Sequence, residues 1–407
     1  MNICIISKVI ITHSKGGVQD HIKDLTEGIV KKGHSVVILT TRHPENKEYE
    51  KTNGVEIYYI HNRKSGNYSH DWSNKLVNEF VKLNERYHFD VVHSQDASAS
   101  ILLKKRLNKI LKIPFIISMH GTAIDEFKTR FNVGFSIKEP IVSLREAALF
   151  AIFLYRYFFR ELNSIKNSDY IIATSKEQKE VIKKYYSADD KKVMIVHNGI
   201  DISKFKPINN QRDIISKYKL EREKINLLCI ARFEKEKGIQ NVLNAIKNVI
   251  NKEKYIQLLV VGDGFYKKNI LKLTKSLSIG KYVRFLGYVD INEIPYFLNY
   301  CDIFINSTNR QNGYDLTVIE AMACGKPVIT TNIGSYPTAI THLKDGYLTK
   351  LKNIRELEQA ILKISSDDKL RITLSKNALI KVKENFTLSS MIDNTLKVYK
   401  NAKNKYI

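Results

Sequence analysis

The sequence predicts an α/β fold made of two doubly wound domains that follow one another along the chain. Three observations lead to this prediction. Short runs rich in Val and Ile alternate with helical patterns along most of the 407 residues. These runs are continuously apolar, which indicates strands covered on both faces and therefore a mainly parallel sheet. The alternation restarts after about residue 200, so we expect two sheets rather than one.

Two series of apolar runs supply the predicted strands. The first series is ICIIS, HSVVILT, VEIYYI, FDVVHSQ, PFIISMH, DYIIAT and KVMIVHN, and the second is INLLCIAR, IQLLVVGDG, YVRFLGY, DIFINST, PVITT and GYLTK. The Asn-Gly and Pro of Asn198–Asn210 interrupt regular structure between the two series. We therefore predict an N-terminal domain over 1–197, a C-terminal domain over 198–385, and a last helix over 386–407 that packs back on the N-terminal domain.

The composition indicates a protein that attracts anions. The formal net charge is +24, which suits nucleic acid, an anionic membrane face or a phosphorylated small molecule. No RNA-binding, zinc-finger or helix-turn-helix pattern accompanies the charge, so we do not expect nucleic acid as a partner. The four cysteines lie far apart and predict reduced, packed thiols rather than disulfides or a metal site.

The N-terminus is apolar from the start and is predicted to be a strand rather than a signal peptide. The apolar stretch Ala147–Phe159 is too short for a membrane span of about 20 residues and contains Arg156. We expect a cytoplasmic protein, with peripheral association at the inner face of the cell membrane as an option. The longer segment EPIVSLREAALFAIFLYRYFFRELNSIK predicts either an interfacial helix or a core helix under a lid.

Two candidate anion sites follow predicted strands, where parallel sheets bind ligands. Gly16 and Gly17 separate the first strand from the first helix, so backbone N–H groups there are able to approach an anion. A plain tight turn explains the two glycines equally well. Arg232 and Lys237 lie at a later strand-to-helix turn and predict a clamp on a diphosphate. A solvated charge run is the alternative there.

A third candidate site is the stretch NGYDLTVIEAMACGKP, which begins at Asn312. Asn312-Gly313 predicts a turn, and Asp315 is expected to cap the helix that follows. The N–H groups of Leu316 and Thr317 are then first-turn donors for phosphate oxygens. Glu320 lies one turn further and leans back toward the same space, where a carboxylate suits the hydroxyls of a ribose. The alternative for Glu320 is an ion pair with a lysine at the rim.

The stretch NGYDLTVIEAMACGKPVITT resembles the signature of the retaining GT-B glycosyltransferases of family four, group 1, in which two glutamates stand eight residues apart. SKGGVQDH, MHGT, HNGID, ARFEKEKGIQNVLNAI, LLVVGDG, VRFLGYV and CDIFINST agree with the same family. Only the segment from Ala123 to Ser168 has no clear counterpart. The resemblance implies two Rossmann-like domains facing across a cleft, and transfer of a sugar, with hexoses expected, from a nucleotide diphosphate sugar to an acceptor hydroxyl. It also implies a role in the synthesis of polysaccharide, glycolipid or lipid-linked glycan.

The resemblance further implies a role for each matching residue. His120 lies beside the donor sugar. Arg232 and Lys237 neutralise the diphosphate in place of a metal ion, and Glu320 binds the ribose. The remaining donor contacts come from Gly16, Gly17, Leu316 and Thr317 for the phosphates and from Gly287, Tyr288 and Val289 for the base, and Gly313 is also expected to bind the donor. No cofactor is expected beyond the co-substrate, for which a UDP-sugar is the first expectation and a GDP-sugar the second.

One position departs from the family. Asn312 stands where the first glutamate of the pair is expected, at a position that contacts the transferred sugar in relatives. Either the enzyme takes a sugar that prefers an amide, which we favour, or activity has been lost and the chain is a non-catalytic sugar-nucleotide-binding protein. A phosphorylase or a sucrose-synthase-like enzyme is a further alternative. On the acceptor side, His93 and Asp96 end a predicted strand and are candidates for holding a hydroxyl, with an ordinary polar strand end as the alternative.

Overall fold

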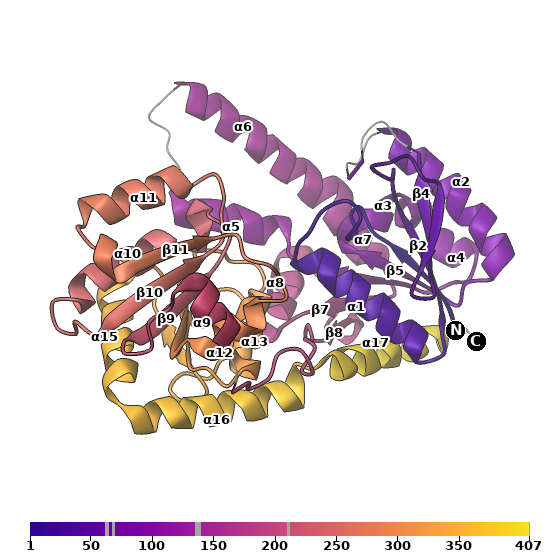
Figure 1. Cartoon of the computed structure of the whole chain (residues 1–407). Helices are drawn as coiled ribbons and strands as arrows, with labels where there is room; N and C mark the ends of the chain where they lie inside the picture. Colours follow the sequence, from indigo (N-terminus) through magenta and orange to yellow (C-terminus); the bar gives the residue numbers. More distant parts are fainter. Residues whose placement is uncertain (62–64, 67–69, 135–139, 210–211, 407) are drawn as a thin grey trace. The chain divides into compact units, whose positions relative to one another are not determined.

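The computed structural model describes residues 1–61, 65–66, 70–134, 140–209 and 212–406, and the chain divides into two compact units (Figure 1). The first unit comprises Met1–Ile124, Ser136–Gly199 and Leu388–Ile407, and the second comprises Asp125–Phe135 and Ile200–Thr387. Asp125–Phe135 therefore lies in the second unit, although the sequence-based boundaries put it in the N-terminal domain. Thr129 in this segment accepts a hydrogen bond from the backbone N–H of Gln311 at 2.8 Å, which ties it to the second unit.

The first unit is built on an eight-stranded sheet with the order β3-β4-β2-β1-β5-β6-β7-β8. Its strands are β1 (Asn2–Ile6), β2 (Ser35–Thr41), β3 (Tyr49–Thr52), β4 (Val55–Ile60), β5 (Val91–Gln95), β6 (Phe115–Met119), β7 (Tyr170–Ala173) and β8 (Val193–Ile195). All neighbours pair in parallel except β3 and β4. The seven predicted strands are present. The edge strand β3 was missed because its sequence, YEKT, is mostly exposed and carries no apolar run.

Helices cover both faces of the first sheet. The helices of this unit are α1 (Gly17–Lys31), α2 (His70–Tyr87), α3 (Ser100–Lys104), α4 (Leu107–Ile110), α6 (Pro140–Tyr155), α7 (Leu162–Asn167), α8 (Lys176–Tyr186) and α17 (Leu388–Lys403). Alternate residues of β1 enter two different apolar clusters, Cys4 and Ile6 on one face and Ile3 and Ile5 on the other. This burial on both faces explains the continuously apolar strand sequences.

The last helix, α17, packs beside α1 within the first unit (Figure 1). A Cβ atom on Gly28 of α1 would lie 2.1 Å from Cδ1 of Ile392, so the two helices approach closely at this glycine. Lys32 and Asp393 form an ion pair at 3.0 Å at the rim of the same contact. The amphipathic pattern of the C-terminal residues is thus used to cover one face of the first sheet.

The second unit is built on a six-stranded parallel sheet with the order β11-β10-β9-β12-β13-β14. Its strands are β9 (Ile225–Ile230), β10 (Ile256–Val261), β11 (Val283–Gly287), β12 (Ile303–Asn306), β13 (Val328–Thr331) and β14 (Tyr347–Thr349). The helices are α9 (Arg212–Tyr218), α10 (Ile239–Val249), α11 (Lys267–Ser276), α12 (Ile294–Tyr300), α13 (Leu316–Ala323), α14 (Tyr336–Ala339), α15 (Ile354–Ser366) and α16 (Asp368–Asn385), together with most of α5 (Ala123–Val133).

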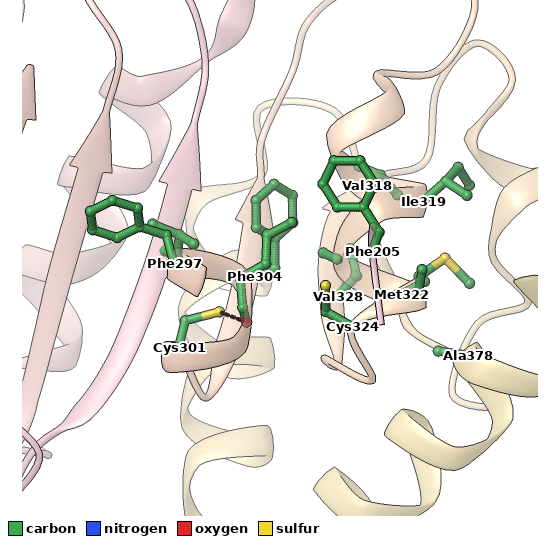
Figure 2. Close-up of a cluster of buried hydrophobic side chains, with 14 of the residues drawn as sticks. Phe205, Phe297, Cys301, Phe304, Val318, Ile319, Met322, Cys324, Val328 and Ala378 are labelled. Atoms are coloured by element: carbon green, nitrogen blue, oxygen red, sulfur yellow. Dashed lines mark hydrogen bonds between the residues drawn. The ribbon is translucent and has the colours of Figure 1, made fainter. Parts of the chain in front are cut away.

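Helix α13 is embedded in an apolar cluster of the second unit. Figure 2 shows Val318, Ile319 and Met322 of this helix among Phe205, Phe304, Val328 and Ala378. The small residues of the AMACG run fit this close packing between the sheet and α16. All four cysteines, including Cys301 and Cys324 of this cluster, are buried free thiols, as predicted.

The strand order reverses once in each sheet. In the first sheet β1 lies between β2 and β5, and in the second β9 lies between β10 and β12. Connections from the two strands at such a point leave toward opposite faces of the sheet, so the loops after their carboxyl ends form a crevice that binds ligands. The fold therefore directs attention to the loops after β1 and β5 and to those after β9 and β12.

Candidate active site

The loop after β1 ends at the N-terminus of α1. Gly16 occupies the N-cap position, and no side chain caps the helix. The next residue, Gly17, is exposed. Uncapped first-turn N–H groups are the feature that makes a helix N-terminus able to receive an anion. The N–H groups at the start of α1 lie beside the strand-order reversal, and the role of Gly16 and Gly17 as a ligand loop stays a prediction.

Three histidines, His21, His93 and His120, lie close together in the first unit. His120 follows β6, and its Nε2 lies 2.7 Å from Oε1 of Gln95 at the end of β5. The backbone N–H of His120 donates to the carboxylate of Asp96 at 2.8 Å. The ring of His21 on α1 meets the His120 ring edge-on, with 4.7 Å between the ring centroids. The loop predicted from the first strand and the predicted histidine are therefore brought together by α1.

His93 is placed differently from the sequence-based prediction. Its side chain is fully buried, with Nδ1 2.6 Å from the hydroxyl of Tyr399 and Nε2 2.8 Å from Oγ of Ser118. Both ring nitrogens are thus engaged inside the unit, and we correct the prediction that His93 holds an acceptor hydroxyl. Asp96 is only partly buried, so the structure leaves its predicted role open.

Burial keeps all three histidines neutral. It lowers the pKa of His93 to about 3 and that of His120 to about 4, and it holds the pKa of His21 well below its usual value, with His120 adding to the effect. Within the described residues, no group of three or more His, Cys, Asp or Glu side chains is arranged to hold a metal ion. Near pH 7 all three imidazoles are therefore neutral. His120 is partly exposed, whereas both ring nitrogens of His93 are engaged inside the unit and those of His21 are buried.

In the second unit, Lys237 ends the short 3₁₀ helix η4 (Lys235–Lys237) that follows β9. Its Nζ lies 2.5 Å from Oδ1 of Asp315, and the lysine side chain is 8% exposed. Gly238 comes next with φ at +72°, and a Cβ there would lie 1.6 Å from the carbonyl oxygen of Ser307. Only glycine fits this approach, because the turn must pass under the chain that follows β12.

Asp315 occupies the N-cap position of α13, but its side chain does not cap the helix. Besides Lys237, the carboxylate accepts hydrogen bonds from Nδ2 of Asn306 at 2.9 Å and from the hydroxyl of Tyr336 at 3.0 Å. The prediction of a capping Asp315 is therefore wrong, since the carboxylate is used to fix Lys237. Burial opposes ionisation of Asp315, but Lys237 and Arg310 outweigh it and hold its pKa well below the usual value.

Arg310 is a cation that sequence reasoning missed. Its Nε donates to Oδ1 of Asn312 at 3.2 Å and lies 3.4 Å from Oε1 of Glu236. Its position two residues before Asn312 was the available signal. Arg232, by contrast, has a largely exposed side chain that pairs with Glu234 at 2.9 Å. The strand-order reversal thus collects Lys237 and Arg310 at the start of α13.

Two family models match this chain. The model of group 1 glycosyl transferases matches residues 210–380, and the model of glycosyltransferase family 4 matches residues 15–204. The chain belongs to glycosyltransferase family 4, group 1. The family and the enzyme class predicted from the sequence are thereby confirmed.

Known proteins similar to this glycosyltransferase show the same fold. The α-monoglucosyldiacylglycerol synthase of Streptococcus pneumoniae is 26% identical over 323 residues, which are 77% of this chain and 67% of that one. The sucrose-phosphate synthase structure from Thermosynechococcus elongatus has a TM-score of 0.80 at 18% identity and covers 99% of both chains. A protein of Anabaena solved with UDP-glucose has a TM-score of 0.74 at 16% identity and covers 98% of this chain and 100% of that one. These structural similarities establish the GT-B fold.

The other predicted donor residues in the second unit of this glycosyltransferase lie at or before the start of α13, in its second turn, and at or just after the end of β11. Glu320 is partly exposed in the second turn of α13, while Ile319 and Ala321 beside it are buried. Gly313, Leu316 and Thr317 are partly exposed at the start of this helix. After β11, the carbonyl of Gly287 accepts from the N–H of Gly262 at 2.8 Å. Tyr288 is 71% exposed and Val289 is buried. The roles of these residues in donor binding stay predictions.

Proposed function

We propose that this glycosyltransferase moves a sugar from a nucleotide diphosphate sugar to an acceptor hydroxyl and retains the anomeric configuration. The observation that carries the proposal is the gathering of Lys237 and Arg310 beside the uncapped start of α13, at the strand-order reversal of the second sheet. Cations and helix N–H groups converging on one place suit a diphosphate. The retaining outcome is supported by the family resemblance.

Stabilising the departing diphosphate is the main chemical task in such a transfer, because negative charge grows on it as the glycosidic bond breaks. Lys237 and Arg310 supply positive charge there without a metal ion. Arg232, whose exposed side chain pairs with Glu234, is the third cation of this proposal. Lys237 is already fixed by Asp315, so it costs little further ordering when a diphosphate binds. Glu320 holds the ribose from the second turn of α13, and Asn312 contacts the transferred sugar.

A UDP-sugar is the proposed donor, with a hexose as the transferred group. The UDP-glucose in the Anabaena structure supports this choice. The exposed ring of Tyr288 is available to the base of UDP and of GDP alike. Thermal shifts with UDP, GDP and ADP at equal concentrations test it, since a ligand that binds only the folded protein raises the melting temperature. We expect the largest shift with UDP, and an equal or larger shift with GDP contradicts the choice.

Turnover itself is tested with a panel of UDP-sugars and release of the nucleotide as readout. We expect release with at least one sugar and none after Lys237→Ala. The exposed Lys235, two residues earlier, is the matched control, and Lys235→Ala should leave release unchanged. Asn312 favours one rival, a non-catalytic sugar-nucleotide-binding protein, which binding without any release would support. Turnover that depends on added inorganic phosphate would point instead to a phosphorylase.

A lipid-linked acceptor at an anionic membrane face is the proposed second substrate. Six large apolar side chains are exposed on consecutive turns of α6 and of the π-helix η2 (Arg156–Glu161), namely Phe150, Ile152, Leu154, Tyr155, Phe158 and Phe159. Their exposure argues against a core helix and, with the net charge of +24, suits contact with lipid. The lipid in the name of the Streptococcus relative supports the same class of acceptor. Glu139, the first residue of the predicted interfacial segment, lies outside the described residues.

Co-sedimentation with vesicles containing anionic lipid tests this membrane contact. We expect salt-sensitive binding that falls after Phe158→Ser together with Phe159→Ser. Tyr255→Ser is a matched control, because it removes an equally exposed aromatic ring from the second unit. Equal binding by all three proteins, or no binding by the unaltered one, contradicts the proposal. None of the helices in the described part of the chain has the length and apolar character needed to cross a bilayer.

A further inference from the structure

We propose that Gln95 and Tyr399 are positioning residues that hold His120 in a single neutral tautomer, with the proton on Nε2 and Nδ1 left as a hydrogen-bond acceptor. The tautomer is a property of the first unit alone. Its use, to accept a hydrogen bond from a hydroxyl of a substrate, rests on the proposed function.

The orientation of the Gln95 amide fixes the tautomer. Its Nε2 lies 3.5 Å from Nδ1 and 3.4 Å from Nε2 of His93, and the in-plane positions of both ring nitrogens are already taken by Tyr399 and Ser118. The amide nitrogen therefore lies over the face of the imidazole, where an N–H group is favourable and a carbonyl oxygen is not. The orientation of the Gln95 amide is thus assigned from its contacts with His93, and it places the amide oxygen toward His120.

An amide oxygen only accepts hydrogen bonds, so Nε2 of His120, at 2.7 Å from it, must carry the proton. A neutral imidazole has one proton, and Nδ1 is then an acceptor. Nδ1 of His120 has no hydrogen-bond partner among the described residues. Nδ1 of His120 can therefore accept a hydrogen bond from a hydroxyl group, but it cannot donate one to a carbonyl or phosphate oxygen.

Tyr399 extends this arrangement to the C-terminal helix. Its hydroxyl, fully buried on α17, bonds Nδ1 of His93 at 2.6 Å, and Ser118 holds the opposite nitrogen at 2.8 Å. The two hydroxyls set the plane of the His93 ring, and the ring face in turn sets the Gln95 amide. The chain of contacts from Tyr399 through His93 and Gln95 to His120 explains why a residue about 280 positions from His120 in the sequence is placed beside this site.

His21 closes the other side of His120. Its ring nitrogens are buried and have no hydrogen-bond partner, and its edge contacts the His120 ring. This contact is between ring edge and ring face and includes no hydrogen bond to His120, so it does not compete with Gln95 for the proton. The backbone of His120 is fixed separately by Asp96. The ring and the backbone of His120 are therefore each held by named partners.

The tautomer is measured on the full-length protein without any ligand, by long-range proton–nitrogen correlation spectra of protein labelled with ¹⁵N-histidine. The ring signals of His120 are assigned by their disappearance from the spectrum of the His120→Gln variant. At pH 7 we expect a protonated Nε2 and an unprotonated Nδ1. After Gln95→Met, which keeps the volume but removes the acceptor, we expect a mixture of tautomers. A wild-type His120 protonated on Nδ1 or on both nitrogens, or an unchanged spectrum after Gln95→Met, overturns the proposal.

Kinetics of nucleotide release then test the use of the tautomer, with whichever UDP-sugar gives release. We expect Gln95→Met to lower kcat about tenfold, the equivalent of one hydrogen bond, with little change in the donor KM. Tyr399→Phe should lower kcat less and in the same direction. Tyr406→Phe is its matched control, since Tyr406 bonds Asp169 rather than a histidine.

The two levels of the proposal fail separately. If the spectra agree but no UDP-sugar releases nucleotide, the positioning of His120 stands and the proposed function fails. If release occurs and Gln95→Met changes KM alone, or if Tyr406→Phe lowers kcat as much as Tyr399→Phe, the positioning role is overturned.

Discussion

Lys237 and Asp315, which are 78 residues apart in the sequence, form an ion pair with 2.5 Å between Nζ and Oδ1, in which the lysine is buried and the carboxylate is partly buried. Asn306 and Tyr336 satisfy the second carboxylate oxygen, so the pair has the additional hydrogen bonds that a buried charge requires. The pair joins the loop after β9 to the start of α13. It therefore links the two elements on which the proposed diphosphate site is built.

This relationship predicts a non-additive pair of substitutions. Lys237→Met leaves the partly buried Asp315 carboxylate without its cation and should lower the free energy of unfolding by about 3 kcal/mol. Asp315→Asn alone should have a similar cost. The double variant removes both charges and should recover most of the loss, because no unpaired charge remains.

Urea unfolding of the four proteins measures the coupling, and nucleotide release measures function. We expect the double variant to be nearly as stable as the unaltered protein and inactive. A double variant whose loss equals the sum of the single losses would show that the ion pair contributes no coupling. Recovery of activity together with stability would show that Lys237 acts only in the fold.

The pH dependence of stability should reflect the buried histidines. The pKa of His93 is lowered to about 3 by burial, below the value of about 6.5 in the unfolded chain. Between these values the unfolded state binds the proton and the folded state does not, so stability is complete above about pH 6.5 and falls as the pH decreases. At pH 5 this single group should lower the free energy of unfolding by about 2 kcal/mol relative to its value at pH 7.5.

The measurement is the free energy of unfolding in urea from pH 7.5 to pH 5, for the unaltered protein and for His93→Gln. We expect the free energy of unfolding of the variant to fall by about 2 kcal/mol less between pH 7.5 and pH 5 than that of the unaltered protein. Parallel curves would mean that His93 takes up a proton in the folded state, or that it keeps a low pKa in the unfolded chain.

The fold was predictable because burial on both faces of a parallel sheet gives continuous apolar runs, as in β1 and β10. The loops that carry the candidate site were predictable because each follows such a run. The partners of individual side chains were not. Nothing in the local sequence distinguishes an Asp315 that caps a helix from one that binds Lys237, or an accessible His93 from one sealed by Tyr399, since both partners come from distant segments.

Replacing His21 with phenylalanine should leave the stability of the protein unchanged or raise it. Its two ring nitrogens are buried without partners, and a buried polar group left unsatisfied costs about 1–3 kcal/mol. His21→Phe removes that cost and keeps a ring against His120, so we expect an unchanged or higher melting temperature. His13 is the matched control, because its Nε2 bonds the carbonyl of Thr41 at 3.1 Å and its Nδ1 accepts from the N–H of Ile10 at 3.2 Å.

His13→Phe should accordingly lower the melting temperature, since it leaves a backbone N–H and carbonyl without their partner. Thermal unfolding at pH 7.5 compares the three proteins. A loss of stability in His21→Phe as large as that in His13→Phe would show that the His21 nitrogens are paired in solution, for example through ordered water.

Asn312 is the position where a charge change should alter donor choice. Its Oδ1 accepts from Nε of Arg310 at 3.2 Å, so a carboxylate at this position would be received by a cation already in place. Asn312→Glu should therefore fold normally and restore the residue type that the family resemblance implies for contact with sugar hydroxyls. A charged acceptor forms stronger hydrogen bonds with hydroxyls than an amide does. We expect kcat/KM for neutral UDP-hexoses to rise about tenfold, which corresponds to one charge-assisted hydrogen bond.

Gln311→Glu is the matched control, because it adds the same charge one residue earlier, where the backbone N–H rather than the side chain is bonded to Thr129. Nucleotide release with a panel of UDP-sugars compares the two variants. An equal response of both variants would mean that only the overall charge matters. A fall in kcat/KM for every sugar in Asn312→Glu, with no change in Gln311→Glu, would mean that the amide is required and that the transferred sugar presents an acceptor, not a hydroxyl donor, to this position.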